Sequence, residues 1–454
     1  MRRAAVVGAL IALLVSPNGV LAQMSPGARS VAMGGGGMVF ATGVDAVEWN
    51  PANLGWAGGW NLNVEVGVSA LGSGATFDEI LAIFGEDVLG AGDLNVAQII
   101  NNLPSDGFRL SAVSEGYATA WGAEKAELPT PTTPLPTVGI AFGPIGIRVR
   151  SRFLSEMTLS KELADLIGNG FVQENIQSYA VGNTGWRTTS FSEVTVSYGT
   201  TLGGLLSVGV GGRYVMGHGM MSGRFFEPEI DLSCIGDPLP PDCTPYSVQA
   251  VGVEATSGTG YGLDIGFSLD LPAGFRAAVS GTNVVQRMTW DEGLVSHSAT
   301  FTDQDFDETD FIDLLNDFET EPVTPNAVSL AVYEASRGLF EESYFPQVFR
   351  AGLGWQAGGT SLEAVGIKVS PRGRYASAWD ERISIGIEQK LPLLTLRAGM
   401  AQATDGLGAL TGGVALGLGP IKIEASGGKF TAREGASWDG YYGTIAIQIK
   451  GGGS

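Results

Sequence analysis

The chain of 454 residues has no long apolar run beyond its first 22 positions. A transmembrane helix needs about 20 consecutive apolar residues, and nothing after residue 22 approaches that length. Only helices and closed barrels satisfy every backbone polar group in lipid. This absence leaves two classes for the chain: a soluble protein rich in β-structure, or a transmembrane β-barrel.

Basic residues are also few. Lysine and arginine number 26 against 47 acidic residues, which gives a formal net charge of −21. Proteins that bind nucleic acids or anionic surfaces carry clustered basic side chains. Nucleic acid is therefore not an expected partner.

Histidine is scarcer still, because His218 and His297 are the only two. The sequence contains no G-x-S-x-G elbow, no H-E-x-x-H motif and no phosphate-binding glycine loop. We therefore expect no enzyme, no catalytic residue, no cofactor and no metal site.

The acidic segment 303–314 resembles a calcium loop, but Glu308 and Leu314 stand where that loop requires glycine and glutamate. A solvated loop is the favoured interpretation, and weak divalent binding is the alternative.

Two features indicate export. The first 22 residues have the pattern of a secretory signal: two arginines, an apolar stretch at 4–15, and small residues before a predicted cleavage at Gln23. The two cysteines, Cys234 and Cys243, lie close together around a proline-rich segment. In an oxidising compartment, such a pair is expected to form a local disulfide.

Glycine is abundant, at 68 residues, and four glycines stand in a row at Gly34–Gly37, within the segment Gly27–Gly55. This segment is too rich in glycine for a stable helix and too irregular for a strand. It ends in an Asn-Pro-Ala turn, where the proline pushes Asn50 out of the helical region. We expect an N-terminal hatch at residues 23–58. The residues expected to gate it are Gly34, Gly35, Gly36, Gly37, Asn50, Pro51 and Ala52. A purely structural turn is the alternative interpretation.

From residue 59 to 450 the polarity alternates. In Tyr261–Leu271, six apolar side chains at every second position alternate with small and acidic residues. We expect an all-β fold: a transmembrane antiparallel barrel of 14–16 strands, with lipid outside, polar groups inside and a flexible tail at 451–454. The polar face carries Glu65, Arg213, Asp264, Asp270, Arg350, Arg382, Glu388, Arg397 and Glu424. A soluble sandwich would alternate similarly, but the strand number and the aromatic residues at strand ends favour a barrel.

The pattern G-A-R-S-V-A-M-G-G…D-A-V-E-W-N-P-A-N-L at residues 27–54 resembles the N-terminal signature of the FadL superfamily of outer-membrane barrels. That superfamily includes long-chain fatty-acid transporters and PorV-like barrels of type IX secretion. The resemblance implies a 14-stranded barrel with a hatch, in the outer membrane of a Gram-negative-type bacterium. It covers about thirty residues. The final strand departs from the pattern, because IAIQIK does not end on an aromatic residue.

Two functions remain open at this point. The first is a channel for hydrophobic small molecules such as fatty acids, in contact with outer-membrane lipid. Amphipathic helices expected in residues 76–102 would supply a ligand-capture surface of Phe77, Ile80, Leu81, Phe84 and Ile99, or would simply pack together as a lid. The second is a non-conducting barrel that binds an exported protein. In either case, Asp45 and Glu48 of the hatch are candidates to pair with Arg213 or Arg397 in the lumen.

Overall fold

The computed structural model describes residues 27–73, 108–115, 117–120, 130–134, 136–162, 178–180, 184–225, 229–231, 247–292, 295–302, 319–322, 347–370, 381–404, 407–432 and 438–451. Some predictions fall outside these ranges: the leader, the five ligand-capture residues, both cysteines and the acidic segment. Among the described residues, no helix is long and apolar enough to cross a membrane.

Strands dominate the described chain, as the alternating polarity predicts. The hatch contains α2 (Ala28–Ala32), α3 (Val44–Trp49) and the 3-10 helix η1 (Pro51–Trp56), and a further 3-10 turn, η2 (Pro272–Gly274), joins two strands. The strands are β1 (Trp60–Ser73), β2 (Phe108–Glu115), β3 (Tyr117–Ala120), β4 (Thr130–Pro134), β5 (Thr137–Phe142), β6 (Ile145–Leu159), β7 (Ser178–Ala180), β8 (Gly185–Leu202), β9 (Leu206–Phe225), β10 (Glu229–Asp231), β11 (Ser247–Ala255), β12 (Ser257–Asp270), β13 (Phe275–Glu292), β14 (Val295–Thr302), β15 (Glu319–Pro322), β16 (Gln347–Ala357), β17 (Thr360–Ser370), β18 (Glu381–Lys390), β19 (Leu394–Ala403), β20 (Leu407–Leu418), β21 (Ile421–Ala432) and β22 (Trp438–Gly451).

The main sheet closes on itself. The first strand, β1, pairs with the last, β22, along its whole length, from Trp60 opposite Gly451 to Ser73 opposite Trp438. All its pairings are antiparallel, and the wall has 14 strand positions. The structure thus confirms the predicted barrel at the lower end of the expected range. The last strand includes Gly451, so it extends one residue into the predicted tail.

Four of the 14 positions are shared by two successive strands. At the second position, β2 and β5 both lie between β1 and β6. Strand β5 pairs with residues 60–65 of β1, and β2 pairs with residues 67–73. The segment between them contains the β3–β4 hairpin, which forms its own small sheet. Similarly, β11 and β12 share one position, and β13 and β14 share the next. In the position after that, β15 pairs with β14 and β16 pairs with β13.

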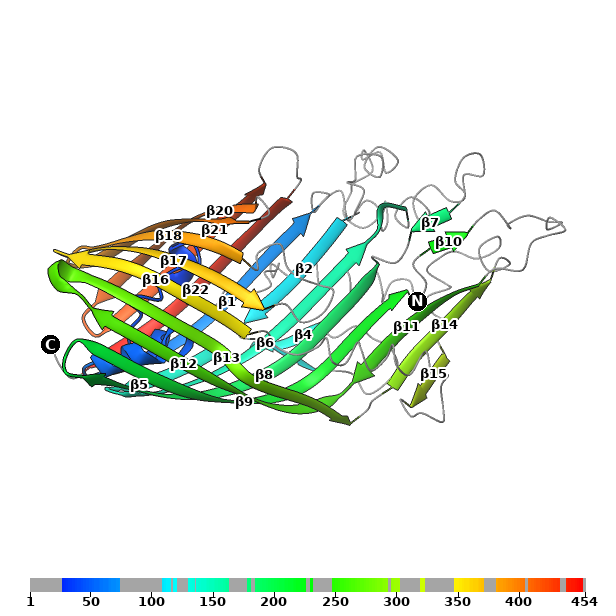
Figure 1. The fold of residues 1–454 in the computed structure, drawn as a ribbon, viewed down its shortest axis with the longest axis horizontal. Helices are drawn as coiled ribbons and strands as arrows, with labels where there is room; N and C mark the ends of the chain where they lie inside the picture. Colours follow the sequence, from blue (N-terminus) through cyan, green and yellow to red (C-terminus); the bar gives the residue numbers. More distant parts are fainter. Residues whose placement is uncertain are drawn as a thin grey trace.

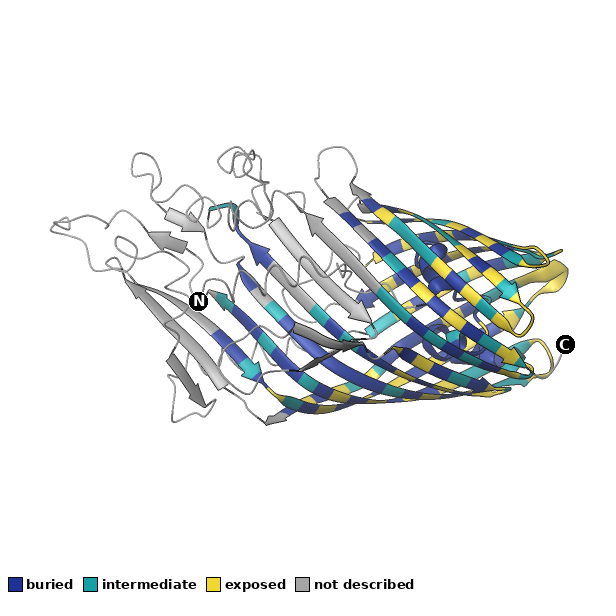
Figure 2. Ribbon diagram, turned by 180° about the vertical axis from the view of Figure 1, so that it is seen from behind, coloured by how far each residue is buried: buried dark blue, intermediate teal, exposed yellow. Residues whose placement is uncertain are grey.

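The wall is apolar outside and polar inside. In β12, buried and exposed residues alternate along almost the whole strand, with Phe267 exposed and Asp264 buried. Figure 2 shows the same striping around the barrel. Every residue of the predicted polar face is buried except Asp270, which is partly exposed at a turn and pairs with Arg276. Exposed apolar and buried charged residues are the arrangement of a barrel in lipid.

The two ends of the barrel differ. At one end, six connections of two to four residues join neighbouring strands, among them the turn at Gly358-Gly359. At the other end, most connections are longer, such as the one between β1 and β2, but β19 and β20 are joined through only three residues. The hatch helices, in dark blue, lie inside the barrel toward the short-turn end (Figure 1).

Candidate functional site

The hatch contains short helices, which corrects the expectation that its glycine content would exclude them. Helix α2 has five residues and α3 has six. Residues of both are buried, and they contact the strands of the wall. Short helices are marginal on their own, but packing can stabilise them. The sequence could not predict this packing because it depends on the surrounding barrel.

The Asn-Pro-Ala turn has the predicted backbone. Asn50 is extended, with φ −161° and ψ 100°, and Pro51 begins η1. The Asn50 side-chain oxygen accepts the Ala52 N–H at 3.1 Å, and its amide nitrogen donates to Ser268 Oγ at 3.1 Å. Ser207 Oγ donates to the Ala52 carbonyl at 2.5 Å. The turn is therefore tied to two wall strands, β9 and β12.

The glycine stretch makes equally close contact with the wall. Gly34 has a φ of +73°, which favours glycine, and a Cβ there would lie 2.6 Å from the Met400 carbonyl oxygen. Its own carbonyl accepts a hydrogen bond from Ser384 Oγ at 2.8 Å. On the wall, Gly386 and Gly399 leave room for Met33 of the hatch. These glycines allow backbone to lie against backbone.

Arg29, which the sequence analysis did not single out, is the centre of one buried ion-pair network. It lies 2.5 Å from Glu363 and 3.3 Å from Glu388. Glu388 also binds Arg397 at 2.7 Å, and Arg397 reaches Glu424 at 2.7 Å. Burial alone would lower the pKa of Arg29, but the two glutamates outweigh it and hold that pKa above its ordinary value. Helix α2 is thus fixed to the wall by charge.

Glu48 of α3 is at the centre of a second network. Its carboxylate lies 3.0 Å from Arg150 and 3.6 Å from Arg213. Arg213 also binds Asp264 at 2.8 Å and Glu193 at 2.5 Å. Burial opposes the charge of Glu48, but Arg150 and Arg213 hold its pKa below the ordinary value. The carboxylate is therefore ionised at neutral pH.

These networks test the predicted pairings of the hatch residues Asp45 and Glu48 with Arg213 or Arg397 in the lumen. The pairing of Glu48 with Arg213 is confirmed. Arg397 binds the wall residues Glu388 and Glu424 and is linked to the hatch through Arg29, which shares Glu388. Burial, followed by the charge of Glu424, raises the pKa of Asp45. The sequence identified some of these charged residues, such as Glu48, Arg213 and Glu388, but not Arg29 or Glu363, and it could not show which of them meet.

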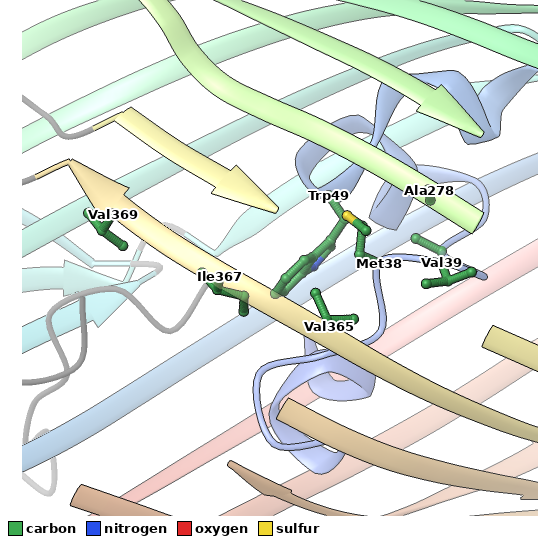
Figure 3. Packing of buried hydrophobic residues seen from close by; sticks show 8 residues of the cluster. Met38, Val39, Trp49, Ala278, Val365, Ile367 and Val369 are labelled. Carbon is green, nitrogen blue, oxygen red and sulfur yellow. The ribbon is translucent and has the colours of Figure 1, made fainter. Parts of the chain in front are cut away.

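An apolar cluster joins the hatch to the wall beside these charges. Met38, Val39 and Trp49 pack against Val365, Ile367 and Val369 on the lumenal face of β17, and against Ala278 of β13 (Figure 3). The Arg350 guanidinium lies 4.9 Å from the centre of the Trp49 ring. The β17 residues form an apolar stripe in a largely polar lumen, and this stripe leads to the hatch. Sequence reasoning missed it because Leu362 and Ala364 on the outer face are apolar as well, so the polarity of this strand hardly alternates.

The closed barrel and the buried hatch define a class: a transmembrane β-barrel of 14 strands with an N-terminal segment docked in its lumen. No protein-family profile and no curated protein sequence matches the chain. Among solved structures, the toluene transporter TbuX of Ralstonia pickettii is similar, with 15% identity, a TM-score of 0.52, and coverage of 94% of this chain and 98% of TbuX. The toluene transporter TodX of Pseudomonas putida has 12% identity and a TM-score of 0.48, with 95% and 99% covered. The likeness to TbuX shows a shared fold.

Proposed function

We propose that the chain is an outer-membrane channel for hydrophobic small molecules, fatty acids among them, and that its hatch is the gate. The observation that carries this proposal is the apolar stripe of Val365, Ile367 and Val369, which leads along the lumen to Trp49 of the hatch. Such a stripe favours the passage of apolar solutes, because contact with it removes their apolar surface from water, whereas polar solutes gain no free energy from apolar contacts.

Three further features support the proposal. The fold is shared with TbuX, a toluene transporter by name. Residues 27–54 resemble the hatch signature of the FadL superfamily. The leader pattern is that of an exported chain.

Short turns in outer-membrane barrels face the periplasm, so the hatch would block the periplasmic half of the lumen. The gating residues would be Gly34–Gly37 and Asn50–Ala52, because they hold the hatch against the wall.

Uptake by whole cells tests the proposal. The chain would be expressed in a Gram-negative host that lacks its own uptake barrel for fatty acids, and entry of labelled oleate and labelled toluene would be measured against an empty vector. Uptake of at least one compound above the vector is expected. Uptake at the vector level, with the folded barrel present in the outer membrane, would contradict the proposal.

The alternative of a barrel that binds an exported protein depends on the acidic segment and the two cysteines, which lie outside the described residues. Co-purification of one specific surface protein, lost when residues 303–345 are deleted, would favour that alternative.

A further inference from the structure

Arginine side chains are concentrated on one side of the lumen, where α3 meets the wall. Arg148, Arg150 and Arg152 occupy alternate positions on β6, so all three share its lumenal face. Across the sheet, Arg148 lies opposite Thr195 of β8, and Thr195 lies opposite Arg213 of β9. These three residues lie side by side on neighbouring strands, so Thr195 is flanked by an arginine on β6 and another on β9.

The hatch places the Glu48 carboxylate among these arginines, beside Glu193 of β8, which also pairs with Arg150 and Arg213. Glu48 reaches Arg150 at 3.0 Å and Arg213 at 3.6 Å. Its Oε2 atom is buried and has no hydrogen-bond donor within the part of the chain that the structure describes. Glu48 thus binds these cations by charge, without the parallel hydrogen bonds that make carboxylate–guanidinium pairs strong.

Arg148 is the least satisfied member of the group. Its side chain is 1% exposed, and its nearest carboxylate oxygen, on Glu65, is 3.8 Å away. None of its three guanidinium nitrogens has a hydrogen-bond acceptor among the described residues. A buried cation without hydrogen bonds is costly. Beside it, Gly139 has no side chain, and Val44 of α3 fills that space. Helix α3 therefore covers the Arg148 side of the group.

We infer that Arg148, Arg150 and Arg213 form a binding site for the carboxylate of an apolar organic acid, and that Glu48 occupies this site while the hatch is closed. The inference rests on the proposed function and specifies the cargo. An incoming carboxylate replaces Glu48 at Arg150 and Arg213 and supplies the acceptors that Arg148 lacks. One carboxylate replaces another, so the lumen keeps its charge while α3 loses its ionic contact with the wall.

The apolar part of such a cargo has a place close by. Trp49 follows Glu48 directly on α3, and its ring packs against Val365 and Ile367 of the apolar stripe. A molecule with its head group at the arginines can thus lay an apolar tail along β17. A neutral hydrocarbon can use the stripe but cannot displace Glu48, so the site distinguishes acids from neutral compounds of the same length.

Equilibrium binding to the purified full-length protein in non-ionic detergent tests the inference. The probes are labelled decanoate and labelled 1-decanol at pH 8, where the acid is ionised. The wild type is expected to bind decanoate about tenfold more tightly, as charge-assisted, two-point recognition provides. Glu48→Gln keeps the side-chain shape and removes the competing charge, so it should strengthen decanoate binding severalfold and leave decanol binding unchanged.

Two further variants make the test specific. Arg148→Met should abolish the preference for decanoate without weakening decanol binding. Arg382→Met removes another buried lumenal arginine, on β18, and should leave both affinities unchanged. Folding of each variant is checked by its shift between unboiled and boiled samples on SDS gels. Equal binding of acid and alcohol by the wild type, or no effect of Glu48→Gln, would overturn the site and leave the proposed function standing. Binding of neither probe would contradict both.

Discussion

Gly209 shows how closely the wall approaches the hatch at the scale of a single residue. A Cβ at this position of β9 would lie 2.3 Å from the Ala52 nitrogen and from the Pro51 carbonyl carbon. Real Cβ atoms do not approach backbone so closely, and a packed interior transmits such a clash to its neighbours. The Asn-Pro-Ala turn can therefore dock only against a residue without a side chain.

Gly209→Ala is expected to lift this turn away from β9 and destabilise hatch docking by about 1–3 kcal/mol, the usual cost of overpacking. Gly212→Ala is the matched control on the same strand, because no atom lies within 4 Å of a Cβ there. Conductance in planar bilayers is the measurement. The first variant should open more often than the wild type, and the second should not. Equal conductance of all three would show that Gly209 does not hold the hatch.

Asp45 gives the hatch a pH dependence with a definite sign. Its pKa is raised, first by burial and then by Glu424, against the opposing charges of Arg148, Arg29 and Lys450. A carboxyl with a raised folded pKa contributes full stability below its unfolded pKa of about 3.9, and that contribution is lost as the pH rises through the folded value. Docking of the hatch should therefore weaken between pH 4 and neutrality.

Asp45→Asn removes this loss, so the variant should hold the hatch more firmly than the wild type at pH 7 and about equally at pH 4. The rate of proteolysis within the hatch, measured at both pH values, tests the difference. Glu48 does not contribute to this pH dependence, because its pKa is lowered and it stays ionised over this range. A difference between variant and wild type that is the same at both pH values would contradict the assignment.

At this scale, the sequence revealed residues whose backbone is constrained locally. Asn50 is extended because Pro51 follows it, so its conformation can be predicted from two letters. Arg29 is different, because its partner Glu363 lies 334 positions along the chain. No local pattern connects them. The glycines of the hatch were identified, but the wall glycines that receive it were not, because a glycine in a strand does not indicate what lies against it.

At the scale of the element, the wall was predictable because a strand's period of two is a local property. Each strand in lipid must present one apolar face, so β12 could be recognised from its own residues. The interruption between β2 and β5 could not, because it is defined by pairing with β1 and β6. The helix α3 was missed for the same reason: the barrel stabilises it, and its own six residues do not.

Helix α3 can be locked to the wall. The Val44 Cβ lies 3.3 Å from the position of a Cβ on Gly139, close to the separation of about 3.5–4.5 Å that a disulfide requires. We predict that Val44→Cys with Gly139→Cys, in a chain whose Cys234 and Cys243 are replaced by serine, forms a bond that holds α3 in place. Oxidised cells should take up labelled oleate at the vector level, and a reducing agent should restore uptake.

The single variant Val44→Cys in the same background is the control for the lock, because it cannot form the bond and should transport under both conditions. Transport by the oxidised double variant, with the disulfide demonstrated by mass spectrometry, would mean that cargo passes without movement of α3. That result would contradict both the gate and the displacement of Glu48.

At the scale of the whole molecule, the fold is held together by a closed ring of backbone hydrogen bonds around buried charge. The exposed outer wall is apolar, as at Leu353 and Ile385, while Glu363 and Arg213 are buried inside. In water this arrangement would expose a large apolar surface. In lipid or detergent the apolar wall is solvated, and no strand edge is left unpaired where β1 meets β22.

A closed ring should resist detergent denaturation until it is heated, because no strand can leave without breaking the hydrogen bonds on both its sides. The purified protein is therefore expected to need detergent and to migrate faster on SDS gels unboiled than boiled, with a urea-unfolded sample running at the boiled position. Deletion of the hatch, residues 27–58, should keep this shift, since the 14 strand positions pair among themselves. A soluble protein without a shift would contradict the barrel. Loss of the shift on deleting the hatch would instead mean that the ion pairs of Arg29 and Glu48 are needed to close the wall. The hatch would then be required for folding of the barrel as well as for gating.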